Sequence, residues 1–386
     1  MRSWLRPVAV HADGGTKPEI VEATLLALEE AYDAMARRGW PGPVPDGGLG
    51  GGGELDLYLV SGGAHFDEAR ADGAVEWTLF DTASAYAVVD PEVDRDALRA
   101  CVVAAYAQAV LLSLDPAEAL SWRRATATWL AWSITGRYGC DDAVERQQRE
   151  PWSGWLSEGA LGGSGGALFL AILSARHDGG SGEFIRDVWL LARQRSDSKV
   201  ALRGSPDIWM ALARALDVAR DDLDHNVEEI AVSRWFAGDP LREPNSPMPI
   251  LNDLNTDAAI SATSMVALRR GSARSTPSDP ALEPFGSGYV LFDVSAVARP
   301  GIVKLWLRGE FGVRWSFVAV RLGARGQELG RMRAPPRLEP SAYLPVEVTT
   351  DTEQILCVAT NLSSRLPDAD LGDDNIRSFQ VIAEVD

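Results

Sequence analysis

The most apolar stretch of the chain lies at residues 97–112 and predicts a central helix. Apolar side chains occupy nearly every face of this segment, and a helix that is apolar all round must be enclosed by the rest of the protein. A short turn with Pro116 follows, and a second helix is expected over residues 117–135, ending at Gly136. The pattern therefore predicts a buried helix pair.

Strand and helix patterns flank this pair. Before it, apolar residues recur with helical spacing over residues 17–38, and three shorter segments predict strands at residues 7–11, 54–60 and 84–89. After it come amphipathic segments that predict helices at residues 167–176, 182–194, 207–216 and 224–236. The first part of the chain is thus expected to be an α/β layer followed by a helical region.

Beyond residue 285 the apolar positions change to a period of two, which is typical of half-buried strands. Short alternating runs with turn residues between them predict strands at residues 288–294, 301–308, 315–322, 343–349, 354–361 and 378–385. Regularly spaced short strands indicate a β-sandwich. Cys357 is expected to be a buried strand residue. The preceding residues 237–285 are rich in Pro, Ser, Asn and Gly and predict a surface linker, with one helix or strand near residues 260–268.

These patterns together predict an α+β fold in four parts. We expect an α/β N-terminal layer over residues 1–95 and a helical part over residues 96–240. A linker over residues 241–285 then leads to an all-β sandwich domain over residues 286–386.

Composition narrows the class of protein. A chain of 386 residues with 46% hydrophobic content can bury a large core. Its formal charge of −18 and pI near 4.7 argue against binding nucleic acid or an anionic membrane surface, since both require basic patches. We expect no membrane span, because no apolar run approaches the roughly 20 residues that one needs. The first residues lack the apolar region of a signal peptide, so the protein is cytosolic or its export segment is missing from the chain.

Two of the three cysteines, Cys101 and Cys140, fall at the ends of the helix pair that an antiparallel arrangement brings together. They are candidates for a disulfide. The alternative interpretation is two buried thiols, since free cysteine is commonly buried.

Candidate catalytic residues are few. Ser164 lies in a Gly-rich run of the form G-x-S-x-G, as in a nucleophile elbow, but no buried strand precedes it. None of His11, His65, His177 and His225 can be assigned to it as a base from sequence. A serine hydrolase and a plain loop between helices are therefore both open. The same glycines are followed by no Lys-Ser or Lys-Thr pair, so nothing supports a phosphate loop.

Candidate metal ligands are equally sparse. The pairs His177-Asp178 and His65-Phe66-Asp67 are isolated, whereas metal sites need three or four converging ligands, so solvated turns are the simpler interpretation. One loop concentrates carboxylates, as calcium sites do, without EF-hand spacing. This candidate calcium site comprises Asp368, Asp370, Asp373 and Asp374.

Residues 85–91, the apolar helix and residues 122–129 together resemble the core of a gluzincin-type zinc metallopeptidase. In that family a helix bears an H-E-x-x-H motif and a second helix supplies a glutamate ligand. Residues 312–322 and 358–370 extend the resemblance to secreted bacterial proteins in which a metallopeptidase core precedes a β-sandwich. The resemblance implies a zincin-like fold over most of the chain and an extracytoplasmic location, with a cytoplasmic one as the alternative.

The chain departs from the family at every metal-binding position. Ala104 and Ala105 stand at the first two positions of H-E-x-x-H, Gln108 stands at the last, and Arg124 replaces the glutamate. Alanine offers no lone pair, and an arginine repels the cation, so zinc is not expected. Gln108 and Arg124 could instead hydrogen-bond to each other, or Arg124 could anchor an anionic peptide or carboxylate.

The sequence thus predicts a catalytically inactive metallopeptidase-like protein that acts as a binding or structural module for an unknown protein or peptide partner. Two alternatives stay open. One is a hydrolase that uses Ser164 or the region of His177. The other is a β-sandwich that binds a ligand while the remainder serves as an inert scaffold.

Overall fold

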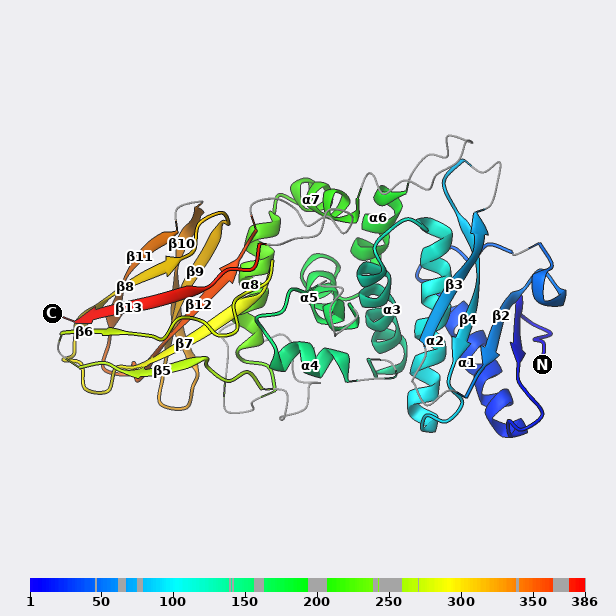
Figure 1. The fold of residues 1–386 in the computed structure, drawn as a ribbon, viewed down its shortest axis with the longest axis horizontal. Helices are drawn as coiled ribbons and strands as arrows, with labels where there is room; N and C mark the ends of the chain where they lie inside the picture. The colour runs from blue at the N-terminus through cyan, green and yellow to red at the C-terminus, as the bar shows by residue number, and fades with distance from the viewer. Residues whose placement is uncertain are drawn as a thin grey trace. The chain divides into compact units, whose positions relative to one another are not determined.

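The structure is a computed structural model that describes residues 1–45, 47–61, 67–74, 79–138, 140, 142–155, 163–193, 207–238, 242, 259–269, 271–337, 340–363 and 375–385. Contacts divide the chain into two compact units (Figure 1). The N-terminal unit comprises Met1–Val144 and Leu156–Ala219, and the sandwich unit comprises Glu145–Trp155 and Arg220–Asp386. The fold is mixed α and β with a β-rich C-terminal part, as predicted.

The N-terminal unit contains a small, mainly parallel sheet. Strands β1 (Val8–His11), β2 (Leu55–Leu59) and β4 (Ala83–Val89) run parallel, and β3 (Asp67–Ala74) pairs antiparallel with β4, giving the order β1-β2-β4-β3. A 3-10 turn, η1 (Leu49–Gly51), precedes β2. Of these strands, β3 was not predicted.

Helices cover one face of this sheet. α1 (Pro18–Arg37) packs against β1, and α2 (Arg95–Leu114) packs against β3, β4 and α1. The Asp94 carboxylate caps α2 by accepting from the backbone N–H groups of Asp96 and Ala97. Every residue of α2 from Ala100 to Leu114 is buried, so the predicted central helix is confirmed.

α2 also corrects one expectation. By length and composition this helix is apolar enough to cross a membrane, although no such run was expected from the sequence. In the structure 94% of its most apolar window is buried inside the protein. The core helix of a folded domain has the same composition, so no clear membrane span follows from α2.

The remaining helices of the N-terminal unit pack in sequence onto the far side of α2. α3 lies against α2, α5 against α3, and α6 against α5 and α7. A buried hydrogen bond of 3.0 Å, from Trp189 Nε1 to Thr126 Oγ1, joins α6 to α3. The bounds are α3 (Leu120–Thr135), η2 (Ser164–Gly166), α5 (Ala167–Asp178), α6 (Glu183–Ala192) and α7 (Ile208–Val218).

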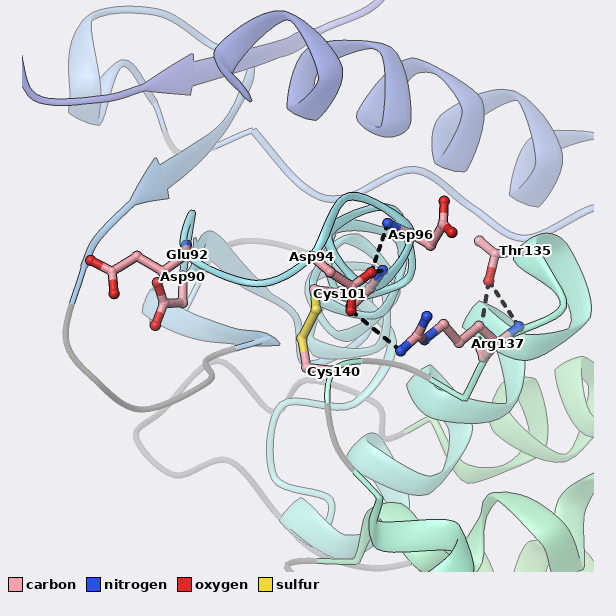
Figure 2. The surroundings of a disulfide bond; sticks show 9 residues. Asp90, Glu92, Asp94, Asp96, Cys101, Thr135, Arg137 and Cys140 are labelled. Carbon is pink, nitrogen blue, oxygen red and sulfur yellow. Dashed lines mark hydrogen bonds and ion pairs between the residues drawn. A yellow bond between two sulfur atoms is a disulfide. The ribbon is translucent and has the colours of Figure 1, made fainter. Parts of the chain in front are cut away.

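Cys101 and Cys140 are joined by a disulfide bond, with Cα atoms 5.1 Å apart (Figure 2). It ties the first half of α2 to the segment that follows α3. Beside it, Arg137 reaches the Asp94 carboxylate at the start of α2, at 3.5 Å (Figure 2). The two helices are therefore held together by a covalent link at the end where α2 begins and α3 ends.

The sandwich unit is built from two antiparallel sheets with one parallel edge pairing, of β5 with β7. The strand orders are β10-β9-β12-β7-β5 and β11-β8-β13-β6. The bounds are β5 (Ser264–Ala267), β6 (Gly271–Arg274), β7 (Ser287–Asp293), β8 (Gly301–Gly309), β9 (Trp315–Leu322), β10 (Glu328–Arg337), β11 (Ser341–Val348), β12 (Gln354–Asn361) and β13 (Phe379–Val385).

The central strand β12 contributes to two separate cores because successive side chains point to opposite faces of a sheet. Ile355 and Cys357 enter the core between the two sheets. Leu356 and Val358 enter a second core on the outer face, where Trp235 packs. The free Cys357 is buried, as predicted.

Helix α8 (Leu223–Arg234) covers that outer face. Its backbone accepts a hydrogen bond of 2.6 Å at Ala231 from the hydroxyl of Tyr289 on β7. The wholly buried Arg234 donates from Nε to Gln148 Oε1 of α4 (Ala143–Arg149) at 3.0 Å, and its guanidinium lies over the Trp155 ring. These contacts hold residues 145–155 and α8 in the sandwich unit.

Three expectations about organisation differ from these observations. The predicted boundary at residue 240 lies after α8, whereas the contacts place α8 and residues 145–155 with the sandwich. The predicted linker 241–285 contains the strand expected near residues 260–268, β5, and also β6, which was not predicted; both form sheet edges. α4 and β10 were not predicted as elements.

We predict that breaking the disulfide destabilises the N-terminal unit. In the chain-entropy description, a link across this separation of 39 residues contributes about 2–4 kcal/mol to the free energy of unfolding. Urea unfolding with and without reductant measures this contribution. The double variant Cys101→Ala/Cys140→Ala should unfold like the reduced protein and be insensitive to reductant. An unchanged midpoint after verified reduction would contradict the prediction.

Candidate functional site

The positions predicted for a degenerate metal site lie in a closed part of the N-terminal unit. Ala104 and Ala105 are 0% exposed and Gln108 is 1% exposed, all on α2, while Arg124 is half-buried on the neighbouring α3. Two alanine methyl groups in a filled core leave neither ligand atoms nor an open coordination position. The suggested hydrogen bond between Gln108 and Arg124 stays a prediction.

Ser164 begins the 3-10 turn η2 between helices. The preceding Gly163 has φ +82°, and a Cβ there would meet the backbone of Ser121 at 2.3 Å, so only glycine fits the close approach to α3. No described histidine or carboxylate hydrogen-bonds the Ser164 hydroxyl. Residues 156–162, in which a preceding strand would have to lie, are outside the described residues.

His177 and Asp178 do not form a pair with Ser164. Asp178 accepts hydrogen bonds from Ser174 Oγ and the backbone N–H of Phe184, which fixes the turn between α5 and α6. His177 stacks on the Phe184 ring, with centroids 4.6 Å apart. α5 separates His177 from Ser164 by most of its length, roughly 15 Å at 1.5 Å per residue, so the histidine cannot act as base for this serine.

The candidate calcium residues lie outside the described residues, as does His65. The four acidic positions are Asp368, Asp370, Asp373 and Asp374. The calcium site therefore stays a prediction.

The structure reveals two buried carboxylates at the turn from α2 to α3. Glu118 Oε1 accepts from the N–H of Ala119 at 2.9 Å, and Oε2 accepts from the N–H of Ile208 at 3.0 Å, at the start of α7. Asp115 Oδ1 accepts from the N–H of Ala117 at 3.2 Å, whereas Oδ2 is buried without a hydrogen bond. Both side chains are at most 5% exposed. Sequence reasoning missed them, because a polar turn ordinarily faces solvent.

Burial in this low-dielectric turn favours the protonated forms. Desolvation, aided by the charge of Asp207, raises the pKa of Glu118 to about 8. Desolvation, aided by the charge of Asp81, raises the pKa of Asp115 to about 7. Perturbed carboxyl groups often mark functional sites, but here Glu118 chiefly bridges the starts of α3 and α7.

A histidine oriented by a buried carboxylate lies on the face of the sheet opposite α2. His11 Nε2 is 2.7 Å from Asp56 Oδ1, Asp56 is 2% exposed, and the Tyr58 ring stacks on His11 at 4.7 Å. This arrangement could orient a general base. Among the described residues no hydroxyl or thiol hydrogen-bonds His11; its ring nitrogen contacts the Asp56 carboxylate.

On α8, three side chains converge closely enough to hold a cation: His225, Glu228 and Glu229. Arg333 of β10 already contacts all three, through His225 Nδ1 at 2.7 Å, Glu228 Oε1 at 3.0 Å and Glu229 Oε1 at 2.5 Å. A metal ion would have to displace this guanidinium. The group is best interpreted as an ion-pair network that fastens α8 to the sheet.

A pocket of about 390 Å³ opens in the sandwich unit at the end of α8. Its walls come from the outer face of the larger sheet, from the residue that ends α8 and from Arg242. The described lining residues are Trp235, Arg242, Ser261, Ala262, Met265, Leu291, Leu322, Gly326 and Gln354. This volume falls within the roughly 300–1,000 Å³ that small-molecule sites span, and the lining mixes polar and apolar groups.

Comparisons with known proteins leave the family open. No protein-family model matches the chain, and no curated protein matches it. Similar solved structures include the pre-peptidase C-terminal domain of a collagenase from Bacillus anthracis, at 7% identity and a TM-score of 0.21, over 33% of this chain and 98% of that domain.

Two further structures match at similar levels. The enzymatically active domain of tailspike protein 4 of bacteriophage CBA120 has 9% identity and a TM-score of 0.20, over 33% of this chain and 18% of the other. A β-glucosidase from Paenibacillus barengoltzii has 11% identity and a TM-score of 0.18, over 36% and 12%. TM-scores this low carry no argument about the chain, and the zincin-like core stays a prediction.

We predict that Glu118 makes stability depend on pH. The folded protein keeps the Glu118 proton up to about pH 8, whereas the unfolded chain releases it near the ordinary value of 4.5. This contribution to stability is therefore complete below about pH 4.5 and is lost as the pH rises to about 8. At about 1.4 kcal/mol per pKa unit, the loss amounts to a few kcal/mol.

Urea unfolding of the wild type and Glu118→Gln between pH 4.5 and 8.5 measures the effect. The neutral variant should gain stability relative to the wild type as the pH rises. Glu22→Gln, at an exposed position on α1, is the matched control and should track the wild type. Parallel pH profiles for the wild type and Glu118→Gln would show that Glu118 is not responsible.

Proposed function

We propose that the protein is a binding or structural module, and that the helix pair α2/α3 does not work as a peptidase site. One observation carries the proposal: Ala104 and Ala105 are wholly enclosed on α2, and Gln108 is 1% exposed beside them. A catalytic zinc needs three protein ligands and a position open to water and substrate. These positions supply neither the ligand atoms nor the opening.

The disulfide supports an extracytoplasmic location for this module. Disulfides persist in oxidising compartments and are rare in the cytosol. The link between Cys101 and Cys140 is built into the buried helix pair, so in our proposal it forms part of the folded state that works outside the cytoplasm.

The pocket in the sandwich unit favours binding over a purely structural role. It combines apolar residues such as Leu291 and Met265 with the polar Arg242 and Gln354, and a mixture of this kind can orient a small ligand. In this version of the proposal the sandwich unit binds a ligand, and the enclosed helix pair supplies a stable core for the N-terminal unit.

We predict that the protein, purified without chelator and after removal of any His tag, contains far less than one zinc ion per chain. Inductively coupled plasma mass spectrometry measures the metal, and a fluorogenic peptide library measures hydrolysis. A known zinc peptidase carried through both assays is the positive control. Stoichiometric zinc together with chelator-sensitive cleavage would overturn the proposal.

A fluorophosphonate probe tests the serine-hydrolase alternative. We expect no labelling of the wild type beyond that of Ser164→Ala, because no described base contacts the Ser164 hydroxyl and an unactivated serine reacts slowly. Mass spectrometry of the labelled peptide identifies any modified residue. Stoichiometric modification at Ser164, absent from the variant, would establish an enzyme and end the proposal of a non-catalytic module.

A further inference from the structure

The guanidinium of Arg234 is a buried cation without a counterion among the described residues. Arg234 is the last residue of α8, is 0% exposed and is one of the largest wholly enclosed side chains of the protein. We propose that the sandwich unit binds one small monovalent anion of the chloride class at this guanidinium. Arg234 is not among the described residues that line the pocket, so this site is independent of the ligand binding proposed above.

Three contacts fix the guanidinium and leave one of its nitrogen atoms without an acceptor. Nε donates to Gln148 Oε1 at 3.0 Å, and Nη2 donates to the carbonyl oxygen of Gln147. The Trp155 ring lies against the guanidinium, with its centroid 4.3 Å from the Cζ atom. Because the guanidinium is a rigid planar fork, these contacts also fix the direction of Nη1, which is buried and has no hydrogen-bond partner.

The groups that contact Arg234 are all neutral: a side-chain amide, a backbone carbonyl and an aromatic ring. In the part of the chain that the structure describes, no carboxylate forms an ion pair with it. Tyr289 lies close enough to influence the pKa of Arg234, but burial raises the pKa of Tyr289 to about 12, so its hydroxyl is uncharged at pH 7. Burial lowers the pKa of Arg234 only to about 10, so the guanidinium keeps its positive charge at neutral pH.

Both the charge and the unused donor require a partner. A charge in the protein interior is strongly unfavourable unless an opposite charge compensates it, and buried donors without an acceptor are rare in folded proteins. A buried water molecule would give Nη1 an acceptor but would leave the positive charge uncompensated. An anion beside Nη1 supplies the acceptor and the compensating charge together, through a charge-assisted hydrogen bond.

Enclosure limits the size and the charge of this anion. Arg234 and Gln148 are 0% exposed and Gln147 is 2% exposed, so a ligand with a body that extends into solvent does not reach the guanidinium. A monovalent anion neutralises the single positive charge, whereas a divalent one leaves excess negative charge in the interior. A spherical halide also accepts from an N–H group in any orientation. These conditions together favour chloride.

Thermal unfolding of the full chain at fixed ionic strength tests the proposal. Sodium chloride replaces sodium gluconate stepwise, so only the identity of the anion changes. Because a ligand that binds the folded state stabilises it by mass action, we expect the melting temperature to rise with chloride concentration and to saturate, by at least about 2 °C in total. Bromide should give a similar rise, because it is also a spherical monovalent ion.

Variants and anomalous diffraction locate the site. Arg234→Met removes the charge while keeping a long side chain, and it should abolish the dependence on chloride. Arg274→Met makes the same change at an exposed position on β6 of the same unit and should leave the dependence unchanged. Crystals of the wild type grown in sodium bromide, measured at the bromine absorption edge, should show one anomalous peak within contact distance of Nη1 of Arg234.

Several outcomes overturn the inference. Equal melting temperatures in chloride and gluconate would show that no anion stabilises the fold. A folded Arg234→Met variant that keeps the dependence on chloride would place the anion elsewhere. If that variant does not fold, the wild-type crystals decide, because a position beside Nη1 that lacks an anomalous peak excludes a halide there. None of these results alters the zinc and peptidase measurements, so failure of the anion site is distinguishable from failure of the proposed function.

Discussion

The N-terminal unit depends on one constraint: α2 is apolar on every face and must be covered on every side. The sheet and α1 cover one side, and α3 covers the other. The unit therefore requires helices on both sides of α2, and its middle turns become the least accessible part of the fold. Whatever residues occupy positions 104, 105 and 108 then lie in a closed core, which is why alanine and a single amide suit them.

A related constraint shapes the sandwich unit. The sheet that contains β12 is apolar on both faces, so the second sheet can cover only one of them. α8 covers the other, and ion pairs fasten it there: Arg314 contacts Asp224, and Arg333 contacts Glu228 and Glu229. The pocket forms where α8 ends and this cover stops.

Local patterns predicted much of this fold. The bounds of β9 and β12 match the predicted strands because both are central strands that pair on both sides and are buried along nearly their whole length, which gives each a clear apolar run. β3 and β10 were missed because both are edge strands. β3 consists of charged and small residues, and β10 contains Pro335 and Pro336 at a register shift. The unit to which α8 belongs and the burial of the Glu118 side chain depend on contacts with residues far away in the sequence. A short stretch of sequence does not contain this information.

Net charge is also a poor guide to a local site. The chain carries a formal charge of −18, which suggests that it repels anions. At physiological ionic strength, however, charges beyond roughly 8 Å are largely screened. The formal charge of the whole chain therefore does not determine the electrostatic potential at any one site.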